Sequence, residues 1–208
     1  MDFITKQVSS LQRVFLDGKC DLKEYNTDSA LKGERFSYQI AYKSDEKFFA
    51  ETIIDSPLSQ YISVRSVGNV PSELPVYERD YEYSERSETG LFPDVLFPIE
   101  NNRILIKPNN YYAVWITIEL PEELKADNCE INISFSRNGE IISINTFDLH
   151  VVNAVLPEQK LIYTQWFHCD GIANYYKVPV FSEYFWQLAE SFMKTAVHTG
   201  VNMLLTPV

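Results

Sequence analysis

The sequence has few cysteines and no long apolar run, and each shortage excludes a class of protein. The three cysteines, Cys20, Cys129 and Cys169, are far apart and form no CxxC pair. An odd number of isolated thiols does not indicate a disulfide framework. No apolar run approaches the roughly 20 residues that span a bilayer, so we expect no membrane-spanning helix.

Basic residues are also in the minority. The 18 lysines and arginines face 29 aspartates and glutamates, which gives a formal net charge of −11. Nucleic acids and anionic membranes both require a basic surface, so neither is an expected partner. The first ten residues, MDFITKQVSS, lack the basic and apolar regions of a signal peptide. Cytoplasmic location is therefore the default expectation.

Motifs of several common enzyme chemistries are missing as well. The chain has no Gly-rich phosphate loop, no HExxH and no G-x-S-x-G. Its three histidines are dispersed, which leaves a Ser or Cys triad without an evident base. His168, Cys169 and Asp170 are adjacent in the chain, and their spacing matches no structural zinc pattern. We therefore expect neither a metal nor a cofactor.

Most of the first 156 residues show the alternation of apolar and polar side chains that is typical of half-buried strands. In 35–43, for example, Phe36, Tyr38 and Ile40 share one face. Asn138-Gly139 is a strong hairpin signal because both residues tolerate positive φ. Residues 19–33 are polar and predict a turn region. Strands are expected at 11–17, 35–43, 48–54, 61–67, 103–106, 111–120, 130–137 and 140–152.

Seven or eight short strands of this kind predict an antiparallel β-sandwich over residues 1–156. The proline-containing segment 68–102 interrupts the strand pattern and predicts a long loop. Its second half, from Gly90 to Pro98, is apolar and should pack against the rest of the protein. Two interpretations are open: a loop that covers the edge of the sandwich, or a loop that lines a cleft beside a neighbouring domain.

The final segment, 157–208, has a different pattern. Residues 161–167 predict a strand buried on both faces, and 168–171 predict a turn. Ser182 can cap a helix over 183–199, with Gly200 placed to end it. Residues 201–205 predict a second strand. Strand, helix and strand in this order form a βαβ unit, whose two strands should be parallel.

A single βαβ unit cannot form a parallel sheet that is covered on both faces. We therefore expect 157–208 to be the first part of an α/β domain, truncated after its second strand. The alternative is a small α+β module that packs on the preceding sheet. The predicted fold class is mainly β, with an N-terminal antiparallel sandwich followed by the βαβ unit.

Several short motifs occur in a recognisable order. They are G-x-x-P-D-x-L-x-P at Gly90, Pro93, Asp94, Leu96 and Pro98; Val114-Trp115-Ile116; Leu156-Pro157; Gln165-Trp166-Phe167-His168-Cys169-Asp170; Ile172-Ala173-Asn174-Tyr175-Tyr176; and Gly200-Val201-Asn202-Met203. Together they resemble the N-terminal portion of glycoside hydrolase family 123 and its bacterial relatives. The characterised members of that family are β-N-acetylgalactosaminidases.

The resemblance implies a β-sandwich accessory domain followed by a (β/α)8 barrel. It also implies substrate-assisted catalysis, in which an adjacent Asp-Glu pair acts on a glycan carrying N-acetylgalactosamine. No residue here matches that pair, and Asp45-Glu46 belongs to the sandwich region. We therefore predict no catalytic residue, and we expect the 208-residue chain alone to be inactive.

Part of a sugar site is nevertheless expected at the end of the strand 161–167. In such barrels, active sites lie at the carboxyl ends of the strands. Gln165, Trp166, His168 and Asp170 occupy that position, where polar groups can bond sugar hydroxyls and an indole can stack on a pyranose. Alternatively, Trp166 belongs to the core, and His168 with Asp170 closes the loop.

Two functional hypotheses follow. The first is a piece of a family-123-like glycosidase whose substrate is a glycan, with self-association expected through the uncovered barrel fragment. The second is a non-catalytic β-sandwich module that binds carbohydrate or protein. An exposed apolar face on the helix 183–199 favours the first hypothesis.

Overall fold

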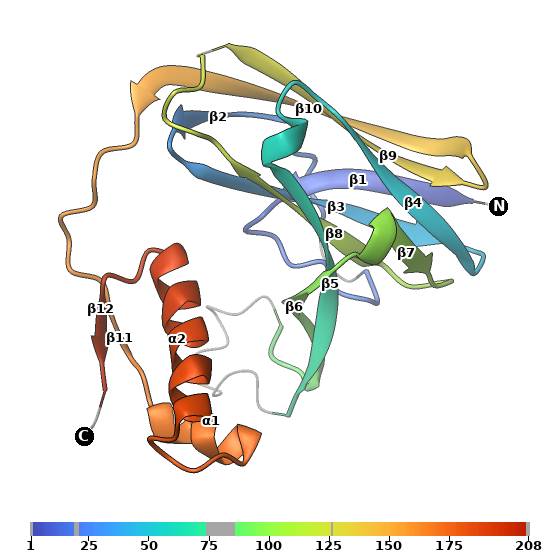
Figure 1. Ribbon diagram of the computed structural model, residues 1–208. Coiled ribbons are helices and arrows are strands. Elements are labelled where there is room, and N and C mark those ends of the chain that lie inside the picture. Colours follow the sequence, from blue (N-terminus) through green and yellow to red (C-terminus); the bar gives the residue numbers. More distant parts are fainter. Residues whose placement is uncertain (1, 19–20, 74–85, 126, 207–208) are drawn as a thin grey trace. The chain divides into compact units, whose positions relative to one another are not determined.

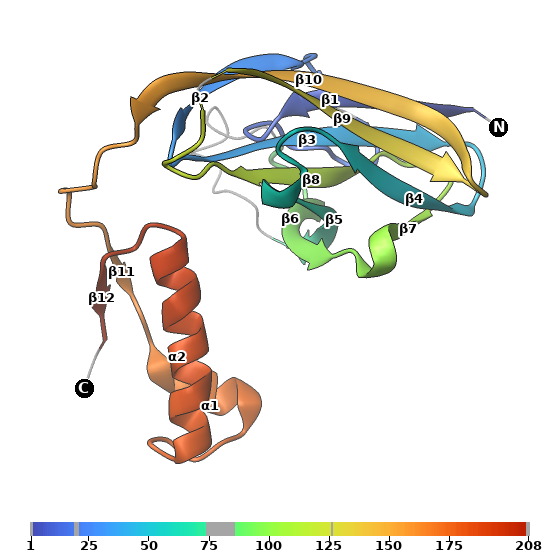
Figure 2. The same ribbon diagram turned by 45° about the horizontal axis from the view of Figure 1, so that its top comes forward.

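The computed structural model describes residues 2–18, 21–73, 86–125 and 127–206 (Figure 1). The chain divides into two compact units, Met1–Leu156 (unit 1) and Pro157–Val208 (unit 2). Unit 1 contains two β-sheets, and unit 2 contains two helices beside a pair of short strands (Figure 2). The prediction of a mainly β chain is confirmed.

Each sheet of unit 1 has five strands. Sheet A contains, in spatial order, β1 (Phe3–Ser9), β3 (Arg35–Ser44), β8 (Tyr112–Glu119), β5 (Ile62–Ser72) and β6 (Gly90–Pro98). Sheet B contains β2 (Thr27–Lys32), β10 (Glu140–Val155), β9 (Asn128–Arg137), β4 (Phe48–Asp55) and β7 (Arg103–Ile106). Short 3-10 turns, η1 (Ser59–Tyr61) and η3 (Glu100–Asn102), precede β5 and β7. The neighbouring strands pair antiparallel, except that β2 is parallel to β10.

The core of unit 1 lies between the two sheets. Tyr38 of sheet A stacks on Phe147 of sheet B, with ring centroids 4.3 Å apart, and neither side chain is exposed. The buried cluster includes apolar residues from the inner faces of both sheets: Ile40, Val114, Ile116 and Ile118 of sheet A, and Ile131, Ile133, Phe135 and Leu149 of sheet B. The apolar residues that alternate along strands such as β3 therefore face this core, while the other face of β3 is also partly covered, since Gln39 and Ala41 are buried.

The hairpin between β9 and β10 turns at Asn138 and Gly139, as the sequence predicts. Their φ angles are +54° and +84°. A two-residue turn with positive φ at both positions matches the twist of the flanking strands, and glycine adopts this conformation without a Cβ clash.

The prediction of a long loop over 68–102 is wrong. The strand β5 continues to Ser72, and β6 pairs with it in register, with Val70 opposite Phe92. The prolines suggested a loop, but β6 is an edge strand, where a missing backbone donor is tolerated. Residues 74–85 lie outside the described range.

The start of the chain also differs from the prediction. The first strand is β1, whereas 11–17 contains a turn in which Gly18 N–H donates to the carbonyl of Phe15. Val14 and Phe15 are buried, so their apolar character reflects packing of a loop and not a strand. Residues 19–33, predicted as a turn region, contain β2.

Unit 2 contains β11 (Thr164–Trp166), α1 (Cys169–Tyr176), α2 (Glu183–His198) and β12 (Met203–Leu205). The strands β11 and β12 are parallel, which confirms the βαβ prediction. Both are short, and all three residues of β11 are exposed, so the expectation of a strand buried on both faces is wrong. The predicted turn at 168–171 is also wrong, because α1 begins at Cys169.

The helix α2 begins as predicted. The Ser182 hydroxyl accepts a hydrogen bond from Phe185 N–H at 3.2 Å, which satisfies one free amide of the first turn. Phe185 and Ala189 are its buried residues, and they form the small core of unit 2 with Ile172, Ala173 and Val201. Trp186 and Val197, two further apolar residues of this helix, are exposed. The helix therefore presents part of its apolar face to solvent.

Candidate functional site

The candidate site lies where the chain leaves β11 and enters α1. Phe167 N–H donates to the carbonyl of Leu205 at 2.8 Å, which extends the pairing of the two strands by one step. His168 follows as the N-cap residue of α1, without a side-chain capping hydrogen bond, and Asp170 is in the first turn. Three predicted site residues therefore occur within five positions at the carboxyl end of a parallel strand.

Trp166 and His168 form an open aromatic surface. Their rings are stacked, with centroids 6.0 Å apart and an interplanar angle of 18°. Trp166 is 69% exposed, so it is not part of the small core of unit 2. An exposed, flat ring pair of this kind can pack against the apolar face of a ligand.

Asp170 lies beside this surface. Its Oδ1 is 3.8 Å from His168 Nδ1, and both side chains are mostly exposed. This distance is too long for a hydrogen bond, and the pair is ionic only when the histidine is protonated. The alternative that the two side chains close the loop by a hydrogen bond is therefore not supported. Both side chains can offer polar atoms to a ligand.

Gln165 is separated from the other three residues. Successive side chains of a strand point to opposite faces, so Gln165 and Trp166 face opposite ways. The Gln165 amide donates to the Tyr163 hydroxyl at 2.7 Å, and Tyr163 shares its face of the strand. The structure thus brings together Trp166, His168 and Asp170, which we name the β11 cluster, and places Gln165 apart from it.

Thr206 is a neighbour of this cluster that was not among the predicted site residues. Cys169 Sγ lies 3.6 Å from Thr206 Oγ1, which links the start of α1 to the residue after β12. The signal was the parallel pairing itself, because the residues that follow two adjacent parallel strands meet at the same edge.

The described residues offer neither a metal-binding group nor a membrane-spanning helix. Within them, no group of three or more His, Cys, Asp or Glu side chains is placed to hold a metal. None of the helices described there has the length and apolar character needed to cross a membrane.

The sequence of this region matches a known protein family. Residues 166–208 match the family model described as the catalytic domain of glycoside hydrolase 123. The match begins at Trp166 and therefore includes the whole β11 cluster. No curated protein matches the chain.

Solved structures add a comparison of the whole chain. A family 123 glycoside hydrolase from Clostridium perfringens, described in relation to glycolipid glycan hydrolysis, is similar at a TM-score of 0.74 and 18% identity. The alignment covers 98% of this chain and 38% of that chain, so the present sequence spans well under half of its relative. At this identity the likeness shows a common fold. Together with the family match, it confirms the resemblance to glycoside hydrolase family 123.

Two further solved structures are much less similar. AvmM, which catalyses macrocyclisation in alchivemycin A biosynthesis, has a TM-score of 0.36 and 6% identity over 76% of this chain and 92% of its own. A complex of a CaDoc0917 variant with CaCohA2 has a TM-score of 0.29 and 12% identity over 61% of this chain and 96% of its own.

Proposed function

We propose that this chain is part of a glycoside hydrolase that acts on glycans carrying N-acetylgalactosamine. The observation that carries the proposal is the match of residues 166–208 to the family 123 catalytic domain. The exposed β11 cluster at the start of that match supports it, because Trp166 and His168 are stacked at the carboxyl end of a parallel strand.

In this proposal the β11 cluster binds sugar. The indole of Trp166 packs on the C–H face of a pyranose ring, which is the apolar surface that a sugar offers. His168 and Asp170 hydrogen-bond hydroxyl groups, with the carboxylate accepting and the imidazole donating or accepting. All three side chains are exposed and available for these contacts.

The chemical step belongs to residues outside this sequence. The mechanism expected from the resemblance is attack by the N-acetyl oxygen of the substrate on the anomeric carbon, while a protein acid protonates the departing oxygen. We assign neither the acid nor the group that orients the acetamide to a residue of this chain. The 208-residue polypeptide is therefore expected to leave chromogenic N-acetylgalactosaminides intact.

The first test is to read the gene beyond the codon for Val208. An open frame with further βα units, and an adjacent Asp-Glu pair after a predicted strand, is the expected result. A stop codon directly after Val208 would contradict the hydrolase proposal for this protein.

The second test uses the product of that open frame and 4-nitrophenyl N-acetyl-β-D-galactosaminide as substrate. Trp166→Ala should lower kcat/KM by about fivefold, because an aromatic contact contributes on the order of 1 kcal/mol. Trp186→Ala is the matched control. Its indole is also exposed, at 49%, but it stacks on Phe181 of unit 2. Equal effects of the two substitutions would contradict the role of the β11 cluster.

A further inference from the structure

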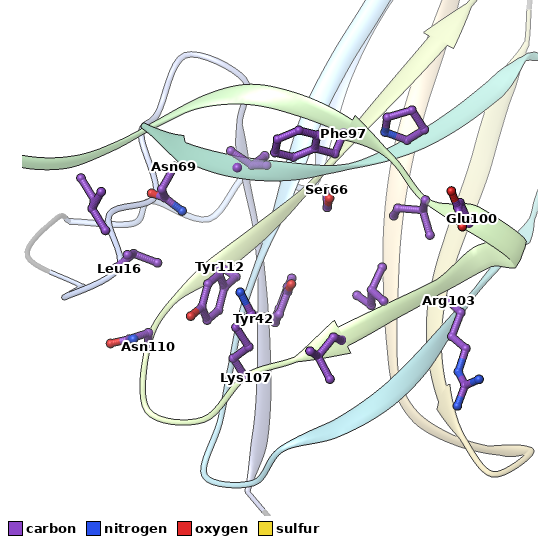
Figure 3. A pocket seen from close by; sticks show the side chains of 17 residues that line it. Leu16, Tyr42, Ser66, Asn69, Phe97, Glu100, Arg103, Lys107, Asn110 and Tyr112 are labelled. Atoms are coloured by element: carbon purple, nitrogen blue, oxygen red, sulfur yellow. The ribbon is translucent and has the colours of Figure 1, made fainter. Parts of the chain in front are cut away.

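A cavity of about 770 Å³ opens in unit 1, far from the β11 cluster in the sequence (Figure 3). It lies between the edge strands of the two sheets, since its lining includes Phe97 of β6 and Ile104 of β7. All of its lining residues belong to unit 1. The volume is within the range of pockets that bind small organic ligands.

The cavity exists because the inner face of β5 becomes small and polar along the strand. Ile62 is buried and Val64 partly buried, and both pack in or against the core, whereas Ser66 follows on the same face. A serine at this position leaves unfilled the space that a larger apolar side chain would occupy. The sheets therefore do not close over one another at this edge.

Gly68 shapes one side of the cavity. A Cβ atom at this position would lie 2.4 Å from the ring of Phe97, closer than two carbons can approach. The absence of a side chain lets Phe97 lie across β5 and border the cavity. This arrangement depends on a glycine at the point where the register between β5 and β6 shifts.

The opposite side of the cavity is aromatic. The rings of Tyr42 and Tyr112 stack with centroids 6.0 Å apart at an interplanar angle of 27°. Tyr42 is only 4% exposed and supports Tyr112 from the core, so the partly exposed Tyr112 is the ring that a ligand can reach. A flat, rigid aromatic surface costs little conformational entropy when a ligand packs on it.

Polar groups lie around the aromatic surface. Lys107 and Asn110 are exposed, and the lysine ammonium is 5.7 Å from the centre of the Tyr112 ring. Figure 3 shows Ser66, Asn69 and Glu100 bordering the same space. The side-chain oxygen of Asn69 is buried without a hydrogen-bond partner among the described residues. The amide can gain a hydrogen bond by turning toward a ligand hydroxyl.

The charges of the lining nearly cancel. The guanidinium of Arg103 stacks on the ring of Phe49, 4.2 Å from its centre, and so is engaged outside the cavity. Arg103 keeps its positive charge there, while Lys107 and Glu100 add one positive and one negative group to the lining. A strongly charged ligand would be repelled by the side chain of like charge. The lining therefore favours a neutral molecule rich in hydroxyl groups.

We propose that this cavity is a binding site for a neutral oligosaccharide. The partly exposed ring of Tyr112, supported by Tyr42, receives the C–H face of a sugar ring, and the amide, hydroxyl and charged side chains bond its hydroxyl groups. The site does not depend on the proposed hydrolase function, because the catalytic-domain match covers only residues 166–208. It would hold a glycan whether or not the β11 cluster contacts one.

The test is binding of neutral oligosaccharides to the 208-residue chain, by calorimetric titration and saturation-transfer NMR. The probes are N,N′-diacetylchitobiose, N-acetyllactosamine, cellobiose and maltotriose. At least one should bind, and Ser66→Phe, which fills the cavity, should weaken binding at least tenfold. Ser63→Phe is the matched control, because Ser63 is an exposed residue on the outer face of the same strand.

A second variant tests the proposal in case Ser66→Phe does not fold. Lys107→Ala combined with Asn110→Ala changes two exposed side chains and should leave the melting temperature unchanged while weakening binding severalfold. No binding of any probe, or binding that survives both variants, would overturn the proposal. Binding lost in Trp166→Ala but kept in Ser66→Phe would assign the sugar to the β11 cluster, and the reverse pattern would assign it to the cavity.

Discussion

Tyr38 combines two properties that rarely occur together at the centre of a protein core. Its side chain is fully buried, and its hydroxyl has no hydrogen-bond partner among the described residues. The ring contributes apolar contact with Phe147, but the hydroxyl loses its bonds to water without replacement. A buried polar atom without a partner costs about 1 to 3 kcal/mol.

Replacing this hydroxyl by hydrogen should therefore stabilise the protein. Tyr38→Phe keeps the ring stacked on Phe147 and removes the unpaired group, so the free energy of unfolding should rise by about 1 kcal/mol. Denaturant unfolding near neutral pH measures the change. Tyr42→Phe is the control and should give a smaller gain, because Tyr42 borders the cavity. A loss of stability in Tyr38→Phe would mean that the hydroxyl is bonded.

The same burial predicts a loss of stability at alkaline pH. Desolvation raises the pKa of Tyr38 and of Tyr42 above the ordinary value of about 10. Above that pH the unfolded chain loses the two phenol protons while the folded chain keeps them. The contribution of these two tyrosines to stability is thus constant below about pH 10 and falls above it, by up to about 1.4 kcal/mol per pH unit for each tyrosine. The decline should be shallower in Tyr38→Phe.

At the scale of elements, the strands and the helix with regular sequence patterns were predictable, whereas the edge strands β2 and β6 were not. Strands such as β3 and β9 follow strict alternation, and α2 has both its capping serine and its buried stripe. The edge strand β2 was missed because Ala30 is its one buried residue, so it carries no apolar pattern. The strand β6 was missed because its prolines resemble loop residues, although an edge strand tolerates them.

The grouping of Trp166, His168 and Asp170 was predictable. These residues are neighbours in sequence at the end of β11, so no tertiary information is needed to group them. The cavity of unit 1 was not predictable. It is formed by side chains of Tyr42, Ser66 and Tyr112, which come together only through sheet pairing and the separation of two edge strands.

The N-terminal cap of α2 gives a direct test at this scale. Ser182→Ala removes the acceptor for Phe185 N–H and should destabilise the helix by about 1 kcal/mol. Hydrogen exchange of the amides in the first turn of α2 should become faster by about fivefold. Ser191→Ala is the matched control, since that hydroxyl bonds only the carbonyl of Gln187 within the helix. Equal effects of both changes would show that the cap is not the cause.

At the scale of the whole molecule, the main feature is the contrast between a sandwich with a large buried core and a unit with many exposed apolar side chains. Large exposed hydrophobic residues of unit 2 include Leu161, Trp166, Tyr175, Phe181 and Val197. Exposed apolar side chains in this number favour association.

We therefore expect the 208-residue chain to self-associate as its concentration rises. Analytical ultracentrifugation should show an average mass that increases with concentration, and Val197→Glu should reduce the increase. Ile144→Glu is the control, because Ile144 is similarly exposed, at 60%, but lies on β10 of unit 1. A chain that stays monomeric at all concentrations would refute this expectation.

The parallel pair of β2 and β10 has a consequence for how the protein emerges from the ribosome. Residues 27–32 pair with 148–155, and roughly 120 residues separate the two strands. The nascent chain must therefore keep β2 without this partner while the rest of the sandwich is synthesised. Sheet B acquires its edge strand only after Val155 has left the exit tunnel. A chain whose synthesis stops within β10 would therefore have a sheet B without its paired edge strand. Such an unpaired edge favours aggregation.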